Sequence, residues 1–283
     1  MERLLAACAR LVQQYTRLAL PVTTALRPGL SQDGLTAQCR GFPGQIPEDV
    51  LAFYRWHNGS GNQEVFPNAR FLALEEALAT YHRLMQSATQ RRPRRQRTPV
   101  AFWEPQWLPL FGDMVSYDEY YAVLCPPSPQ STTPVYYLCC DEDDTMYLAY
   151  DSLTQMLETL AACYETGAYW VCLGSADYKC YVMAHREQVA QLTLAHNPQR
   201  TAWWLAQVPG AQTVEDLATL VEHPYGEVWL AIQVLRDPRL VPPLITVMQH
   251  GTLAARCTAA RLLGELADPR AIAPLLEALR APH

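Results

Sequence analysis

The stretch Asp237-Pro238-Arg239-Leu240-Val241-Pro242-Pro243-Leu244-Ile245 returns 31 residues later as Asp268-Pro269-Arg270-Ala271-Ile272-Ala273-Pro274-Leu275-Leu276. Both copies begin with the same Asp-Pro-Arg triplet, and their apolar positions align. A fixed period of this size is typical of stacked helical repeats, in which each repeat buries its apolar face against its neighbours. Because such arrays usually serve as binding scaffolds, the repeat favours recognition over catalysis.

The two Asp-Pro-Arg triplets also predict where helices begin. Asp237 and Asp268 can cap a helix N-terminus, and Pro238 and Pro269 suit its first position. Two and a half repeats are few for an independent array, so we expect it to dock on the preceding part of the chain through a connector. The expected helices are two antiparallel pairs, 214–222 with 227–236 and 239–250 with 253–267, and a lone helix at 270–280.

Composition limits the function classes that need to be considered. The chain has 283 residues, enough for two domains, with 49% apolar and 18% charged residues. Its net charge of −6 argues against a general nucleic-acid-binding protein. The nine cysteines include no C-x-x-C pair and no Cys/His cluster with zinc spacing. We therefore expect free thiols in a reducing cytoplasm, and no metal and no cofactor.

The sequence contains no membrane or export signal that we recognise. Polar residues interrupt the apolar positions of residues 1–20, unlike the core of a signal peptide. No stretch approaches the roughly 18 apolar residues needed to span a bilayer. These observations predict a cytoplasmic protein with no membrane partner.

The first part of the chain predicts an α+β domain with an antiparallel sheet flanked by helices. Apolar residues at helical spacing indicate a helix over 2–19. The motif Ser152-Leu153-Thr154-Gln155 has the form of a capping box and begins another helix. Further helices are expected at 47–58, 75–87, 182–196 and 201–208, and strands at 70–74, 107–111, 120–125, 134–139 and 146–150.

These patterns carry two resemblances. The Asp-Pro-Arg motifs and the alanine-rich segment Ala254–Leu266 resemble the HEAT-like repeats of phycobilin-lyase-like proteins. The first 170 residues resemble the SUKH superfamily, which includes fungal cell-wall assembly regulators and bacterial toxin-immunity proteins. That resemblance rests on Leu51–Gly59, Phe71–Ala77, Trp107–Phe111, Tyr120–Val123 and Asp151–Trp170, taken in order. It implies a protein-binding domain without catalytic machinery.

The absence of catalytic motifs supports a non-enzymatic interpretation. The chain has no Walker-type glycine loop, no G-x-G-x-x-G after a strand, no H-E-x-x-H and no G-x-S-x-G. A bilin lyase would need a positioned cysteine, and the repeats contain only Cys257, on a face that we expect to be core. The predicted function is therefore a non-catalytic protein-interaction protein, an immunity or regulatory factor. The alternatives are a bilin-lyase-like or other enzyme-associated repeat protein, or a structural subunit of an assembly.

Candidate contact residues come from two places. Arg55, Trp56, His57 and Asn58 end a predicted helix, where Asn58-Gly59 would stop it and Trp56 suits the core as well as it suits contact. Tyr117, Tyr120 and Tyr121 are expected near a sheet edge, and tyrosine is common at interfaces.

Three further segments leave alternatives open. The basic run Arg91, Arg92, Arg94, Arg95 and Arg97 suits an acidic partner or RNA, or is a solvated insertion. The acidic residues 141–144 could bind a cation but lack the pattern of a calcium loop, which favours a hairpin turn. Trp203-Trp204 is expected to be buried rather than to anchor a partner.

The expected domain organisation has three parts. Residues 1–171 form the SUKH-like α+β domain, residues 172–212 form a helical connector, and residues 213–283 form about two and a half HEAT-like repeats.

Overall fold

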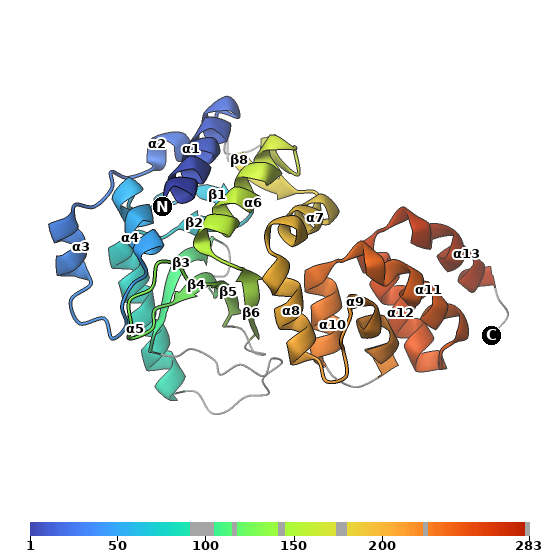
Figure 1. The fold of residues 1–283 in the computed structure, drawn as a ribbon. Helices are drawn as coiled ribbons and strands as arrows, with labels where there is room; N and C mark the ends of the chain where they lie inside the picture. The colour runs from blue at the N-terminus through green and yellow to red at the C-terminus, as the bar shows by residue number, and fades with distance from the viewer. Residues whose placement is uncertain (91–104, 115–117, 141–144, 174–179, 223–225, 281–283) are drawn as a thin grey trace. The chain divides into compact units, whose positions relative to one another are not determined.

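A computed structural model describes residues 1–90, 105–114, 118–140, 145–173, 180–222 and 226–280. The chain divides into two compact units, Met1–His185 and Arg186–His283 (Figure 1). The finer division into a domain, a connector at 172–212 and repeats at 213–283 stays a prediction.

The first unit is an α+β domain, which confirms the predicted fold class. Its helices and strands alternate along the chain. In order they are α1 (Glu2–Arg17), α2 (Val22–Ala25), α3 (Gln32–Gln38), α4 (Glu48–Trp56), β1 (Glu64–Phe66), β2 (Ala69–Phe71), α5 (Leu74–Gln90), β3 (Trp107–Asp113), β4 (Glu119–Leu124), β5 (Val135–Cys139), β6 (Thr145–Tyr150), α6 (Leu153–Glu165), β7 (Tyr169–Leu173) and β8 (Cys180–Ala184).

Strands β1 to β6 form one antiparallel sheet in chain order, and β7 pairs with β8 in a separate two-stranded sheet. Strand β3 is buried along its whole length. On one face of the large sheet, Tyr81 and Leu84 of α5 pack with Tyr120, Leu138 and other alternate residues of β3 to β6. This alternation is the period-2 pattern of a strand with a buried face.

Helices α1, α4 and α6 contact one another and pack with the strand residues of the other face. Phe53 of α4 lies 6.0 Å from Phe111 of β3, measured between ring centroids. The hydroxyls of Tyr15 and Tyr164 both donate to the carbonyl of Val65, each at 2.9 Å. Because these buried hydroxyls share one acceptor, α1 and α6 are fixed to the same point of β1.

The capping prediction at Ser152 is confirmed. Its hydroxyl accepts from the Gln155 amide nitrogen at 3.1 Å and donates to the Gln155 side-chain oxygen at 2.8 Å. Gly167, with φ of 77°, follows the C-cap of α6. A left-handed residue at this point is a common way to end a helix.

The second unit is all-helical. It contains α7 (Arg186–His196), α8 (Pro198–Gln207), α9 (Val214–Thr219), η1 (Leu220–Glu222), α10 (Gly226–Leu235), η2 (Pro238–Leu240), α11 (Val241–His250), α12 (Leu253–Leu266), η3 (Pro269–Ala271) and α13 (Ile272–Arg280). The expected helix at 201–208 is part of α8, whose Trp204 is buried as the sequence favours.

The Asp-Pro-Arg triplets cap helices as predicted. Asp237 accepts from the Arg239 amide nitrogen and Asp268 from the Arg270 amide nitrogen, each at 2.9 Å, with proline in the first turn. Each arginine also forms an ion pair with the aspartate of its own triplet at 2.7 Å. Arg270 further donates to the carbonyl of Pro238 at 2.8 Å. The second turn is therefore bonded directly to the first.

Three expectations about local structure are wrong. Residues 182–196 are not one helix, because β8 extends to Ala184 before α7 begins at Arg186. Cys257 is exposed, although the helical pattern predicts it to face the core. Tyr120 and Tyr121 are not near a sheet edge, since β4 pairs with both β3 and β5.

Candidate functional site

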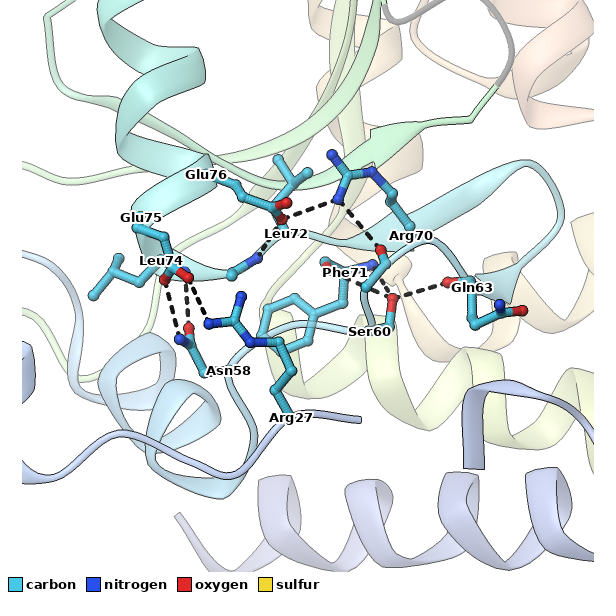
Figure 2. A network of polar contacts seen from close by, with 12 residues as sticks. Arg27, Asn58, Ser60, Gln63, Arg70, Phe71, Leu72, Leu74, Glu75 and Glu76 are labelled. Carbon is cyan, nitrogen blue, oxygen red and sulfur yellow. Dashed lines mark hydrogen bonds and ion pairs between the residues drawn. The ribbon is translucent and has the colours of Figure 1, made fainter. Parts of the chain in front are cut away.

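The loop after α4 holds four of the residues that the sequence proposed as contacts. Asn58 is buried, and its side-chain oxygen accepts from the Leu74 amide nitrogen at 2.8 Å. Its side-chain nitrogen donates to Glu75 at 3.1 Å, and Glu75 also pairs with Arg27 at 2.6 Å (Figure 2). Asn58 therefore ties this loop to the first turn of α5, where backbone N–H groups lack partners within the helix.

Asn58 does not stop α4 in a left-handed conformation, as the sequence suggested. His57, the C-cap residue, is extended, and Gly59 has the positive φ of 92°. A Cβ atom on Gly59 would lie 2.8 Å from the Ala73 backbone nitrogen, so glycine is required for both its backbone angle and its close approach.

Ser60 and Arg70 complete this network. The buried Ser60 hydroxyl accepts from the Phe71 amide nitrogen at 3.0 Å and donates to the Gln63 carbonyl at 2.8 Å. Arg70 donates to Glu76 at 2.9 Å and to the Gly61 carbonyl at 3.3 Å, as Figure 2 shows. These bonds are internal to the fold, so the network stabilises the loop rather than presenting donors to a ligand.

Three neighbouring candidates differ in exposure. Arg55 is exposed, while Trp56 and His57 are half-buried. Trp56 stacks on Phe53 with a ring-centroid distance of 5.6 Å, and His57 Nδ1 lies 2.8 Å from the Arg27 carbonyl. Only Arg55 of the four predicted residues in this loop has a fully exposed side chain, and its role as a partner contact stays a prediction.

The tyrosine candidates do not form an exposed group. Tyr120 is buried on the α5 side of the sheet, where its hydroxyl accepts from Arg83. Tyr121 is half-buried on the other face, beside Phe66 and Tyr137. Tyr117, the acidic residues 141–144 and the basic run Arg91, Arg92, Arg94, Arg95 and Arg97 lie outside the described residues.

An open pocket of about 290 Å³ lies beside Tyr120. Its lining carries both signs of charge, and its guanidinium groups already have partners, since Arg70 pairs with Glu76 and Arg83 bonds to Tyr120. This mixture indicates no single class of ligand. The lining residues are Arg70, Leu72, Thr80, Arg83, Gly112, Asp113, Asp118 and Tyr120.

The largest group of exposed aromatic and sulfur-containing side chains lies on the β7–β8 hairpin. Trp170 is directly opposite Met183, and Cys172 is opposite Tyr181. Cross-strand partners in an antiparallel pair share a face of the sheet. Trp170, Tyr181 and Met183 are 40%, 46% and 45% exposed, and Cys172 is also exposed. We call these four residues the hairpin surface.

The opposite face of the hairpin fixes it to the first unit. Tyr169 and Val182 are buried there, and Tyr169 packs against Tyr164 with a ring-centroid distance of 5.2 Å. The Val182 amide nitrogen donates to a carboxylate oxygen of Glu64 at 2.9 Å. Burial raises the pKa of the Glu64 carboxyl, while the bond from Val182 opposes this rise. The hairpin therefore presents the hairpin surface from a face-anchored strand pair.

Sequence reasoning missed this surface because Gly167 indicates the end of one helix and the residues from Val182 suggest the start of another. The available pattern was the alternation in Tyr169-Trp170-Val171-Cys172 and Tyr181-Val182-Met183, which is typical of strands. An alternation with apolar residues on both faces gives no indication of which face is buried.

Two other classes of site find no support in the same residues. Within the ranges that the structure describes, no three or more His, Cys, Asp or Glu side chains gather so that they could hold a metal ion. Among the described helices, none is both long and apolar enough to cross a membrane.

The fold and the hairpin surface are those of an α+β domain with a protein-contact face, joined to a helical-repeat segment. Comparison with family models gives the particular families. Residues 41–159 match the SMI1/KNR4 family (SUKH-1), and residues 255–281 match the PBS lyase HEAT-like repeat. The chain thus contains a SUKH-1 domain followed by a HEAT-like repeat, as both resemblances predicted. Comparison with curated proteins finds no match.

Proposed function

We propose that this protein is a non-catalytic, cytoplasmic immunity or regulatory factor that binds a protein partner through the hairpin surface. The SUKH-1 domain and the HEAT-like repeat suggest a protein-interaction role. The observation that carries the choice of surface is the exposure of Trp170, Tyr181 and Met183 on one face of two paired strands.

The side chains of the hairpin surface suit protein binding. Tryptophan and tyrosine dominate the binding energy of protein interfaces, and methionine is enriched there. Exposed apolar groups of this kind gain free energy when a partner removes them from water, by about 25 cal/mol for each Å² buried. The hairpin lies beyond residues 41–159, so the proposed contact adds to the family domain rather than belonging to its matched core.

The test is affinity capture with the full chain, followed by reconstitution with the identified partner in purified form. Trp170→Ala combined with Tyr181→Ala should weaken binding by about 100-fold or more, since truncated hot-spot residues cost about 2 kcal/mol each. Leu5→Ala is the matched control, because Leu5 is 44% exposed on α1, away from the hairpin. Equal binding by both variants would place the contact elsewhere.

Thiol protection supplies a second measurement on the unmodified chain. Cys172 belongs to the hairpin surface, whereas the exposed Cys257 lies on α12 of the second unit. A bound partner should slow alkylation of Cys172 and leave Cys257 unchanged. Unaltered alkylation of Cys172 at saturating partner would contradict the proposal.

A further inference from the structure

Helix α13 presents an apolar stripe that nothing among the described residues covers. Ile272, Leu276 and Leu279 are 59%, 48% and 82% exposed, and α13 has no buried residue. Their spacing of four and three residues places them on one face of the helix. The helix follows η3, whose Ala271 is buried, and it lies at the end of the second unit (Figure 1).

The internal repeat shows what such a stripe packs against. With the period of 31 residues that relates the two Asp-Pro-Arg turns, Ile272 corresponds to Val241, Leu275 to Leu244 and Leu279 to Met248. Val241, Leu244 and Met248 are 1%, 0% and 2% exposed. They belong to α11, and α12 packs against α11. The same positions are therefore buried in one repeat and exposed in the next.

The face of α12 that is turned inward defines the chemistry of a suitable partner. It combines small residues with leucines, and its buried residues are Ala255, Ala259, Leu262, Leu263 and Leu266. Small residues let two helices approach closely, and the leucines fill the space between them.

One polar contact adds a direction to this packing. Arg256 of α12 donates from Nε to the Met248 carbonyl at 3.1 Å, in the last turn of α11. Carbonyls in the last turn of a helix lack partners within the helix. The equivalent carbonyl on α13 is that of Leu279. A helix that covers α13 as α12 covers α11 would bring an arginine to this carbonyl.

We propose that the Ile272–Leu276–Leu279 face of α13 binds an amphipathic helix of a partner protein that has the chemistry of α12. Its apolar side carries alanines followed by leucines, and an arginine near its N-terminus bonds to the Leu279 carbonyl. This surface is distinct from the hairpin surface, so the two proposals stand or fall separately.

The probe is a synthetic peptide with the sequence of residues 252–267, carrying Cys257→Ser, a fluorophore and a hydrocarbon staple on its outward face. The staple is needed because isolated helices of this length are marginal in water. Anisotropy titration with the full-length protein should show saturable binding with a Kd on the order of 10 µM. A peptide that also carries Arg256→Ala should bind several-fold more weakly.

The protein variants locate the bound peptide. Leu279→Glu and Ile272→Glu should each weaken binding at least tenfold, because each buries a carboxylate against the peptide. Glu277→Gln is the matched control, since Glu277 is exposed on the same helix. Both apolar residues are exposed, so the variants should keep the melting temperature of the parent chain. Hydrogen exchange should show slower exchange of α13 amides when the peptide is bound.

Three outcomes would overturn the proposal. The first is no saturable binding up to about 200 µM protein, well above the expected Kd. The second is binding that Leu279→Glu does not change, which would mean that the peptide displaces the protein's own α12. The third is a concentration-dependent dimer in sedimentation velocity that Leu279→Glu abolishes, which would make a second copy of this chain the occupant of the face.

Discussion

At the scale of single residues, Asn58 is the clearest case of a polar side chain that serves the fold. Asn58→Ala removes the acceptor of the Leu74 amide nitrogen and leaves that buried N–H without its partner. We expect the free energy of unfolding of the first unit to fall by about 1–3 kcal/mol. Urea unfolding followed by circular dichroism measures this change.

The control for Asn58 is its neighbour Arg55. Arg55→Ala removes an exposed side chain from the same helix end, and its effect on unfolding should stay within about 0.5 kcal/mol. If Asn58→Ala were equally neutral, the link between the loop and α5 would not contribute to stability.

Cysteine reactivity should follow burial. Cys172 and Cys257 are exposed, whereas Cys8, Cys125, Cys140 and Cys163 are buried. Burial raises the pKa of Cys8 and of Cys163 to about 12. Because the thiolate is the reactive form, these thiols are protected by both access and ionisation.

We therefore expect N-ethylmaleimide at neutral pH to label Cys172 and Cys257 within minutes and the four buried cysteines only after denaturant is added. Peptide mapping by mass spectrometry measures the labelling, and Cys172→Ser should remove one rapid site. Rapid labelling of Cys8 in the native protein would show that the contact between α1 and α6 opens readily.

At the scale of elements, the Asp-Pro-Arg turns combine a helix cap with an ion pair, and the two contributions can be separated. Asp268→Asn keeps an oxygen that can accept from the Arg270 amide nitrogen, but it removes the charge that pairs with the guanidinium. We expect a loss of at most about 1 kcal/mol at neutral pH, because the Arg270 side chain is half exposed.

The pH dependence of this variant has a definite sign. The Arg270 guanidinium lowers the pKa of the Asp268 carboxyl below its ordinary value of 3.8. The ion pair therefore contributes its full stability above that value and loses it as pH falls through the folded pKa. The difference between parent and Asp268→Asn should vanish in acid, as measured by thermal unfolding from pH 7 to pH 2. A constant difference would contradict this assignment, and Glu277→Gln serves as the control.

Elements were predictable where a local pattern was sufficient. The Asp-Pro-Arg turns combine aspartate, proline and period, so their caps followed directly from the sequence. The bond from Arg270 to the Pro238 carbonyl did not, because it joins residues 32 positions apart. Asn58 shows the same limit, since its partner Leu74 lies in a different helix. A sequence pattern identifies residues suited to a turn but not the distant group that each one contacts.

At the scale of the whole molecule, order and period were sufficient to predict an α+β domain followed by helical repeats. The candidate surface was not predictable in the same way. Trp170 and Met183 become neighbours only when β7 pairs with β8, and 13 residues separate them in the sequence. The exposure of α13 likewise depends on whether another helix packs against it, because its apolar positions are those that α11 buries.

Each unit has its own buried core, so a cavity in one core should act on the unit that contains it. Leu160 of α6 is 1% exposed in the first unit, and Leu244 of α11 is 0% exposed in the second. Leu160→Ala and Leu244→Ala each remove three buried carbon atoms and leave a cavity, at a cost of about 2–5 kcal/mol. Hydrogen exchange read by mass spectrometry reports both units in one sample. Leu160→Ala should accelerate exchange in α1 and α6, and Leu244→Ala in α11 and α12. If either change accelerated exchange equally throughout both units, the chain would unfold as a single cooperative body, because a local cavity lowers protection only within the segment that opens with it.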